Sequence, residues 1–267
     1  EFNRLPTRNE IIDELNKDDT YLYWLDSLGV EYLSFIAELA RIRGLSISIN
    51  IARAELPTIT SINRDFYDNW EGKKYKNEQL DYIKHIDAGG YNFENNVLPI
   101  HLAKELDIIS DVIDKAATEL ALRHYKRFLI VSDHGASRLA VLRRKVEKYE
   151  TDTKGEHSGR CCELFEPYDL PFAAEENGYL VLADYGRFKG SRAANVEVHG
   201  GASLEEVVVP VIELMLKDSN ITVEMVEEFV IVDFRTGTEI TLFFNSPVKN
   251  VSIVLNGKSY TAFSLDS

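Results

Sequence analysis

Residues 128–135 read FLIVSDHG, an apolar run that stops abruptly at polar residues. A short run of bulky and β-branched residues bounded by polar ones predicts a buried β-strand. Residues 21–26 read YLYWLD and repeat this pattern, with Asp26 directly after the apolar residues. In open α/β sheets, the carboxyl ends of the strands form the edge where ligands bind. The two stretches therefore predict a sheet edge that carries Asp26, Asp133 and His134.

The segments around these strands alternate between strand and helix patterns. Residues 46–51 alternate polar and apolar side chains, and residues 179–183 form another short apolar run, so both predict strands. Helical spacing of apolar residues follows Leu33, and residues 98–122 contain a long amphipathic helix. This alternation predicts an α/β fold in which helices flank a mostly parallel central sheet.

The pattern changes at about Ser219. Residues 230–232, 240–244 and 251–255 are strand-like runs separated by turn residues, and Asn256-Gly257 is a strong hairpin signal. We therefore expect two domains: an α/β domain at residues 1–217 and a small β-sandwich-like module at residues 218–267. The first residues resemble neither a signal peptide nor a natural start, so we expect the first domain to be truncated. Because the second module spans only residues 218–267, we expect it to be small or cut short.

The composition indicates which classes of protein to exclude. The chain has 267 residues, 45% of them hydrophobic, and 30 Lys+Arg against 44 Asp+Glu give a net charge of −14. This apolar content is enough for a folded core. The acidic balance argues against direct DNA binding without a partner and against a polybasic membrane surface. The longest apolar runs fall short of the roughly 18 residues that cross a bilayer.

The only two cysteines, Cys161 and Cys162, are neighbours in the chain. A disulfide between adjacent residues is strained, and no other cysteine offers a partner. We therefore expect a reducing, cytoplasmic protein in which both thiols are small buried apolar groups.

The strand-end residues favour a metal site. One aspartate after a strand often merely caps the next helix, but two such strand ends, one of them with an adjacent histidine, favour metal ligation. Carboxylates combined with histidine suit Zn²⁺ or Mn²⁺ better than Ca²⁺. Two further segments are ambiguous by themselves: the hydroxyl-rich turn at residues 56–63 and the loop that begins at His199.

Taken together, these segments resemble the alkaline phosphatase superfamily, and most of all its PglZ branch, known from bacterial BREX phage-defence systems. The resemblance covers about residues 21–216, and the later β module resembles the small sandwich that follows PglZ domains in some BREX proteins. Five short motifs in the family's order carry it: WLDSLG at 24–29, LPTIT at 56–60, IDAGG at 86–90, SDHG at 132–135 and HGG at 199–201.

The resemblance implies roles for the matching residues. Asp26, Asp133 and His134 would ligate one metal ion, which would also bind the hydroxyl of a nucleophilic threonine. Thr60 is the better match for this nucleophile, and Thr58 is the alternative. A cation lowers the pKa of an alcohol that is otherwise a weak nucleophile at neutral pH.

The resemblance also implies a second metal site and an oxyanion donor. Asn63 matches an amide that relatives place against a phosphoryl oxygen. Asp87 and His199 would hold the second ion, which activates the water that resolves the phosphoenzyme. The family places a second His or Asp four residues after the residue matching Asp87, and here that position is Tyr91. Either a neighbouring side chain substitutes, or the second site is weak or absent; the candidates are His85, Asn92 and Glu94.

Two other polar residues have less specific signals. Arg160 lies in a polar loop, where it could clamp a phosphate bidentately or simply face solvent. His101 begins the long helix, where a surface or capping role is expected.

These observations predict a cytoplasmic metal-dependent phosphoester hydrolase with one or two zinc ions, or Mn²⁺ in their place. Its substrate would be a phosphodiester or a nucleotide, and other phage-defence proteins would be its partners. The alternative is a catalytically weak or inactive PglZ-like scaffold, for which the tyrosine at position 91 is the main argument. A phosphomutase-like transferase is a third and weaker candidate.

Overall fold

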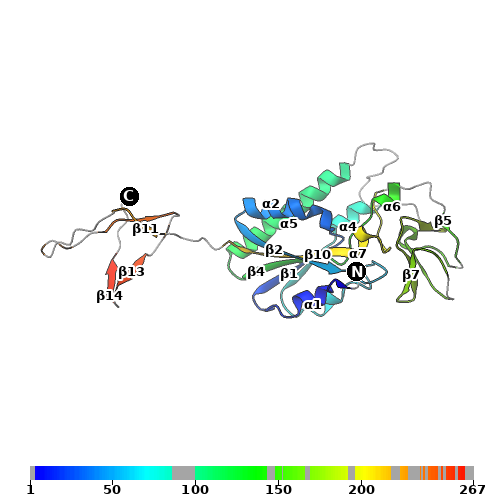
Figure 1. Cartoon of the computed structure of the whole chain (residues 1–267), viewed down its shortest axis with the longest axis horizontal. Helices are drawn as coiled ribbons and strands as arrows, with labels where there is room; N and C mark the ends of the chain where they lie inside the picture. Colours follow the sequence, from blue (N-terminus) through cyan, green and yellow to red (C-terminus); the bar gives the residue numbers. More distant parts are fainter. Residues whose placement is uncertain are drawn as a thin grey trace. The chain divides into compact units, whose positions relative to one another are not determined.

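The computed structural model describes residues 4–85, 100–142, 148–151, 153–165, 169–191 and 196–217, with shorter stretches between 223 and 261. The chain divides into two compact units, Glu1–Lys217 and Asp218–Ser267, and each is described by itself. The centre of unit 1 is a five-stranded sheet in the order β2-β10-β4-β1-β3 (Figure 1). Its strands are β1 (Thr20–Leu25), β2 (Leu45–Arg53), β3 (Lys74–Asn77), β4 (Arg127–Val131) and β10 (Val208–Leu216).

The prediction of a mostly parallel, alkaline-phosphatase-like sheet is wrong. The sheet is mixed: β1 pairs in parallel with β3 and β4, whereas β10 pairs antiparallel with both β2 and β4. The reason lies in the path of the chain after β4. Gly135 and Ser137, which follow β4, donate their N–H groups to the carbonyl oxygens of Glu206 and Val198, which precede β10. The chain therefore enters β10 at the edge where β4 ends, and antiparallel pairing follows.

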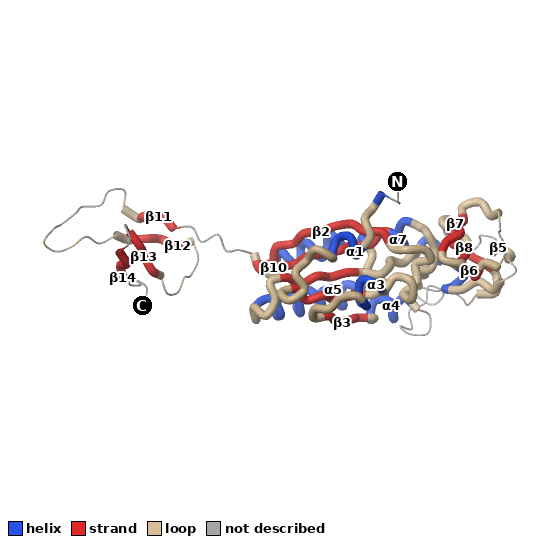
Figure 2. The backbone as a smooth tube through the Cα atoms, turned by 90° about the horizontal axis from the view of Figure 1, so that it is seen from below, coloured by secondary structure: helices blue, strands red, loops and turns tan. Residues whose placement is uncertain are grey.

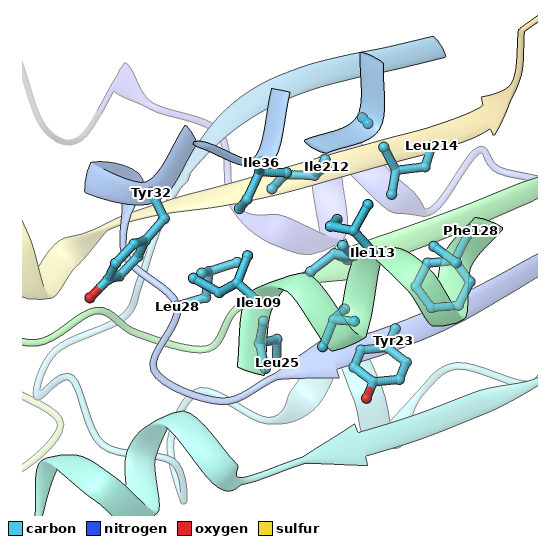
Figure 3. Close-up of a cluster of buried hydrophobic side chains, with 14 of the residues drawn as sticks. Tyr23, Leu25, Leu28, Tyr32, Ile36, Ile109, Ile113, Phe128, Ile212 and Leu214 are labelled. Carbon is cyan, nitrogen blue, oxygen red and sulfur yellow. The ribbon is translucent and has the colours of Figure 1, made fainter. Parts of the chain in front are cut away.

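Both faces of the sheet are covered by helices, because successive residues along each strand point to opposite faces and residues on both faces are apolar. Helices α2 (Leu33–Ile42) and α5 (Ile100–Ala121) cover one face, and α1 (Arg8–Ile12) and α3 (Asp65–Asp68) cover the other (Figure 2). Figure 3 shows Ile36 of α2 and Ile109 and Ile113 of α5 packed over Ile212 and Leu214 of β10. The opposite core contains Leu22, Trp24, Phe66, Leu129, Val131, Val209 and Val211.

The remaining elements of unit 1 are short. They include the helical elements η2 (Val30–Tyr32), α4 (Gln79–Lys84), α6 (Leu139–Leu142) and α7 (Leu204–Val207). Beyond α6, the chain forms the antiparallel sheet β6-β8-β7 with strands Cys161–Glu163, Tyr179–Leu182 and Ala173–Glu176 (Figure 2). The run at residues 179–183 therefore lies in this small sheet and not in the central one. The pair β5 (Lys148–Tyr149) and β9 (Arg187–Phe188) and the turn η3 (His157–Gly159) complete the region.

The described part of unit 2 contains two antiparallel strand pairs. These pair β11 (Val223–Met225) with β12 (Leu242–Phe244), and β13 (Ser252–Leu255) with β14 (Lys258–Thr261). The predicted strand at 230–232 and the Asn256-Gly257 turn lie outside the described residues. Among the helices that the structure describes, none combines the length and apolar character needed to cross a bilayer.

Candidate metal centre

The parallel pairing of β1 and β4 brings two strand ends together. Trp24 of β1 lies opposite Val131 of β4, and Asp26 and Asp133 each follow these residues by two positions in the chain. The Asp26, Asp133 and His134 side chains are buried, and one potential ligand atom from each lies within 4.8 Å of the others. The structure thus brings the three residues of the strand-end prediction into one cluster, which we call site A.

The hydrogen bonds of His134 determine which ring nitrogen faces site A. Its Nδ1 lies 3.0 Å from the Gly135 carbonyl oxygen, which can only accept, so Nδ1 carries the proton in the neutral ring. The Nε2 lone pair then faces Asp133 Oδ2 at 3.2 Å and Asp26 Oδ1 at 3.8 Å. Three acceptors cannot face one another in a buried space unless a proton or a cation lies between them. This tautomer, held by a backbone carbonyl, is typical of a metal-ligating histidine.

The Asp26 carboxylate lacks full compensation within the protein. Lys76 Nζ lies 3.0 Å from its Oδ2, but Oδ1 has no hydrogen-bond partner among the described residues. Burial, together with the nearby Asp133 and Asp81 carboxylates, raises the pKa of Asp26 to about 9, although Lys76 opposes this shift. A bound divalent cation would supply the missing positive charge.

The hydroxyl of Thr60 lies beside site A. Thr60 Oγ1 donates to Asp133 Oδ2 at 3.0 Å and lies 3.3 Å from His134 Nε2. Thr58, the alternative nucleophile, has a different role: its buried hydroxyl donates to the Gly201 carbonyl at 2.7 Å and accepts from Gly200 N–H at 2.9 Å. The geometry therefore favours Thr60 as the reactive hydroxyl and assigns Thr58 to the support of the loop that carries His199.

His199 belongs to a second cluster, which we call site B. Its ring stacks on that of His134, with centroids 4.2 Å apart, and the potential ligand atoms of Asp81, His134 and His199 lie within 4.8 Å of one another. His199 Nδ1 lies 3.0 Å from the Thr58 carbonyl oxygen, so Nε2 is the free acceptor, 3.5 Å from Asp81 Oδ1. Burial and the neighbouring histidines lower the pKa of His199 well below its usual range, which keeps the imidazole neutral as metal ligation requires.

Sequence reasoning missed Asp81, although a signal was present. Asp81 and His85 are four residues apart on and just after α4, so both side chains lie on one side of the helix, and His85 Nε2 is 2.9 Å from Asp81 Oδ2. This spacing is the one expected after Asp87, where Tyr91 stands instead. Asp87 and Tyr91 lie outside the described residues. The described carboxylate beside His199 is that of Asp81.

Asn63 supports the loop that carries Thr60. Its buried amide Nδ2 donates to the Glu55, Pro57 and Ile59 carbonyl oxygens, and its Oδ1 accepts from Glu55 N–H. The predicted role as an oxyanion donor is not supported, because the amide group is engaged within its own loop.

Arg8 connects this loop to site A, and sequence reasoning did not find it. Thr7 and Glu10 form a capping box that starts α1 and places Arg8 in its first turn. The buried Arg8 guanidinium donates to Asn63 Oδ1 at 2.8 Å and to the Asp133 carbonyl oxygen at 2.5 Å. It thereby links the Thr60 loop to the end of β4.

The structure contradicts a phosphate clamp or a solvated position for Arg160. Its side chain is fully buried, donating to both carboxylate oxygens of Glu206 at 3.1 and 2.8 Å and to the Leu182 and Gly186 carbonyl oxygens. The guanidinium therefore ties the β6-β8-β7 region to α7. His101 is likewise buried, not at the surface. Cys161 and Cys162 are free and buried, as the sequence predicted.

The C-terminal residues of the chain match a family model. A family model described as "Domain of unknown function (DUF7862)" matches residues 221–267, which lie in unit 2. No curated protein matches the chain. The match covers less than half of the chain and assigns no activity, so arguments about function come from the geometry of sites A and B.

Proposed function

We propose that unit 1 is a metal-dependent phosphoester hydrolase in which Thr60 is the nucleophile. One observation carries the proposal: His134 Nε2 faces two buried carboxylates, and the Thr60 hydroxyl oxygen lies 3.3 Å from that nitrogen. A site of two carboxylates, one imidazole and one hydroxyl suits Zn²⁺ or Mn²⁺.

The residues present fit such an ion. Asp26, Asp133 and His134 would hold it in site A, and Asp81 and His199, with His85 adjacent, would hold a second ion in site B. Bound at these positions, a divalent cation supplies Lewis-acid charge for the phosphoryl oxygens and lowers the pKa of a nearby hydroxyl.

The protein's own groups position the reacting atoms. Asp133 Oδ2 accepts a hydrogen bond from the Thr60 hydroxyl, which orients Oγ1 for attack. Attack would form a bond from Oγ1 to phosphorus and break the bond from phosphorus to the leaving oxygen, which takes up the proton that Thr60 releases. Water would then cleave the phosphothreonine, which releases the phosphoryl group and restores the threonine hydroxyl. The Thr58 carbonyl oxygen accepts a hydrogen bond from His199 Nδ1 and so holds the His199 ring stacked against the His134 ring. The resemblance to PglZ proteins favours a phosphodiester or nucleotide substrate and phage-defence partners; both stay predictions.

The proposal is tested by hydrolysis of bis-p-nitrophenyl phosphate with added Zn²⁺ or Mn²⁺. Thr60→Val removes the hydroxyl at nearly constant volume, and its loss as nucleophile should lower the rate at least about a thousandfold. The matched control is Thr118→Val, because Thr118 is exposed on α5 and its hydroxyl donates to the Asp114 carbonyl of the same helix. Activity in Thr60→Val equal to that of the wild type would contradict the proposal. A folded wild type that binds no metal would instead favour the scaffold alternative.

A further inference from the structure

A buried ion network lies next to sites A and B without contributing a ligand to them. Lys84, in the last turn of α4, has a side chain that is 1% exposed, and Glu105 and Glu197 are buried beside it. Lys84 Nζ lies 2.9 Å from Glu197 Oε2 and 4.0 Å from Glu105 Oε1. It also donates to the Ser27 carbonyl oxygen at 3.1 Å. We call these three charged residues the Lys84 network.

The contacts of Lys84 connect the segments that carry the proposed ligands. Ser27 directly follows Asp26 of site A. Glu197 precedes His199 of site B by two residues, and Lys84 itself stands between Asp81 and His85. A single buried ammonium thus fixes the end of β1, helix α4 and the loop before α7 relative to one another.

A structural metal is a poor alternative occupant of the network. One potential ligand atom each from His101, Glu105 and Glu197 lies within 4.8 Å of the others, which resembles a metal site. However, Lys84 already supplies a cation at 2.9 Å from Glu197, and the Arg138 guanidinium lies 3.3 Å from His101. A divalent ion would add an excess of buried positive charge, which is costly.

Stability alone also accounts poorly for the network. Desolvating an ammonium and two carboxylates costs several kcal/mol per ion, and apolar replacements of a buried ion network are often neutral or stabilising. Hydrogen bonds to fixed partners do, however, hold side chains and loops in one geometry. Residues that orient metal ligands from outside typically change metal affinity by about 10–100-fold when they are removed.

We infer that Lys84 is a positioning residue that sets the relative placement of the site A and site B ligands. The inference rests on the proposed metal centre. Lys84 touches neither the proposed substrate nor the proposed metal ions. It acts through the Ser27 carbonyl, Glu197 and the helix on which Asp81 lies.

The test is competitive Zn²⁺ titration of the full chain against a chromogenic chelator, with urea unfolding of the metal-free protein measured in parallel. Lys84→Met should weaken zinc binding about 10–100-fold. Because this variant removes the lysine from two buried carboxylates, a triple variant, Lys84→Met/Glu105→Gln/Glu197→Gln, removes all three formal charges of the network together. The control is Lys104→Met, since Lys104 is exposed on α5; its zinc affinity should equal that of the wild type.

The expected result is a triple variant that unfolds cooperatively near the wild-type midpoint but binds zinc at least about tenfold more weakly. A merely structural network would change the unfolding midpoint and leave the zinc affinity of the folded protein unaltered. Zinc affinity within twofold of the wild type in the triple variant overturns this inference alone. A folded wild type that binds no zinc overturns the proposed metal centre and this inference with it.

Discussion

Replacing Arg160 with methionine separates a structural role from a substrate-binding one. The substitution keeps much of the buried stem but removes four hydrogen bonds, two to Glu206 and one each to the Leu182 and Gly186 carbonyl oxygens. Removing one partner of a buried ion pair costs about 3–5 kcal/mol. Glu206 still accepts from Gly201 N–H and from Ser203, which limits the cost to the lower part of that range. We therefore expect a loss of about 3 kcal/mol.

The assay is urea unfolding followed by tryptophan fluorescence, because Trp24 and Trp70 are both buried in unit 1. The midpoint should fall while the slope of the transition stays constant, since the surface exposed on unfolding is unchanged. Arg64→Met is the matched control: Arg64 pairs with Asp68 on an exposed helix face, and its loss should have little effect. A loss below about 1 kcal/mol in Arg160→Met, combined with reduced hydrolysis, would refute the structural role and restore the phosphate clamp.

Two further predictions concern sites A and B. The raised pKa of Asp26 means that the folded metal-free protein binds a proton that the unfolded chain releases above about pH 4. Its stability in chelator should therefore fall as the pH rises from about 5 toward 9, by at most about 1.4 kcal/mol per pH unit. In urea titrations at each pH, Asp26→Asn should make the free energy of unfolding less dependent on pH. Wild type and variant with the same pH dependence would contradict the raised pKa of Asp26. Thr58→Val removes the hydroxyl that bridges Gly200 and Gly201 and should cost about 1–3 kcal/mol in calorimetry. An unchanged unfolding temperature would show that this bridge does not hold the loop.

Local sequence patterns were sufficient to predict much of site A. The apolar runs before Asp26 and Asp133 predicted two buried strands, and their parallel pairing brings both strand ends together. Such strand ends are predictable because the apolar run and the polar residues that end it are neighbours in the sequence. The threonine at position 60 also lies beside this cluster, as the family resemblance implied.

Features that depend on distant parts of the chain were not predictable. The antiparallel direction of β10 depends on a contact between distant residues: Gly135, just after β4, donates its N–H to the carbonyl oxygen of Glu206, just before β10. The burial of Arg160 depends on Glu206, 46 residues away, and a single basic residue in a polar stretch does not reveal such a partner. Asp81 was missed because α4 is short, so its spacing to His85 stood out less than the apolar strands did.

In the proposed metal centre, Asp26, Asp133 and His134 hold a metal ion next to the Thr60 hydroxyl. Anomalous diffraction at the zinc absorption edge, from crystals of the full chain grown with zinc, measures this directly. We expect a zinc peak about 2.0–2.2 Å from the ligand oxygens and the His134 Nε2 atom. A well-ordered site A without a peak, in crystals that contain zinc elsewhere, would contradict it.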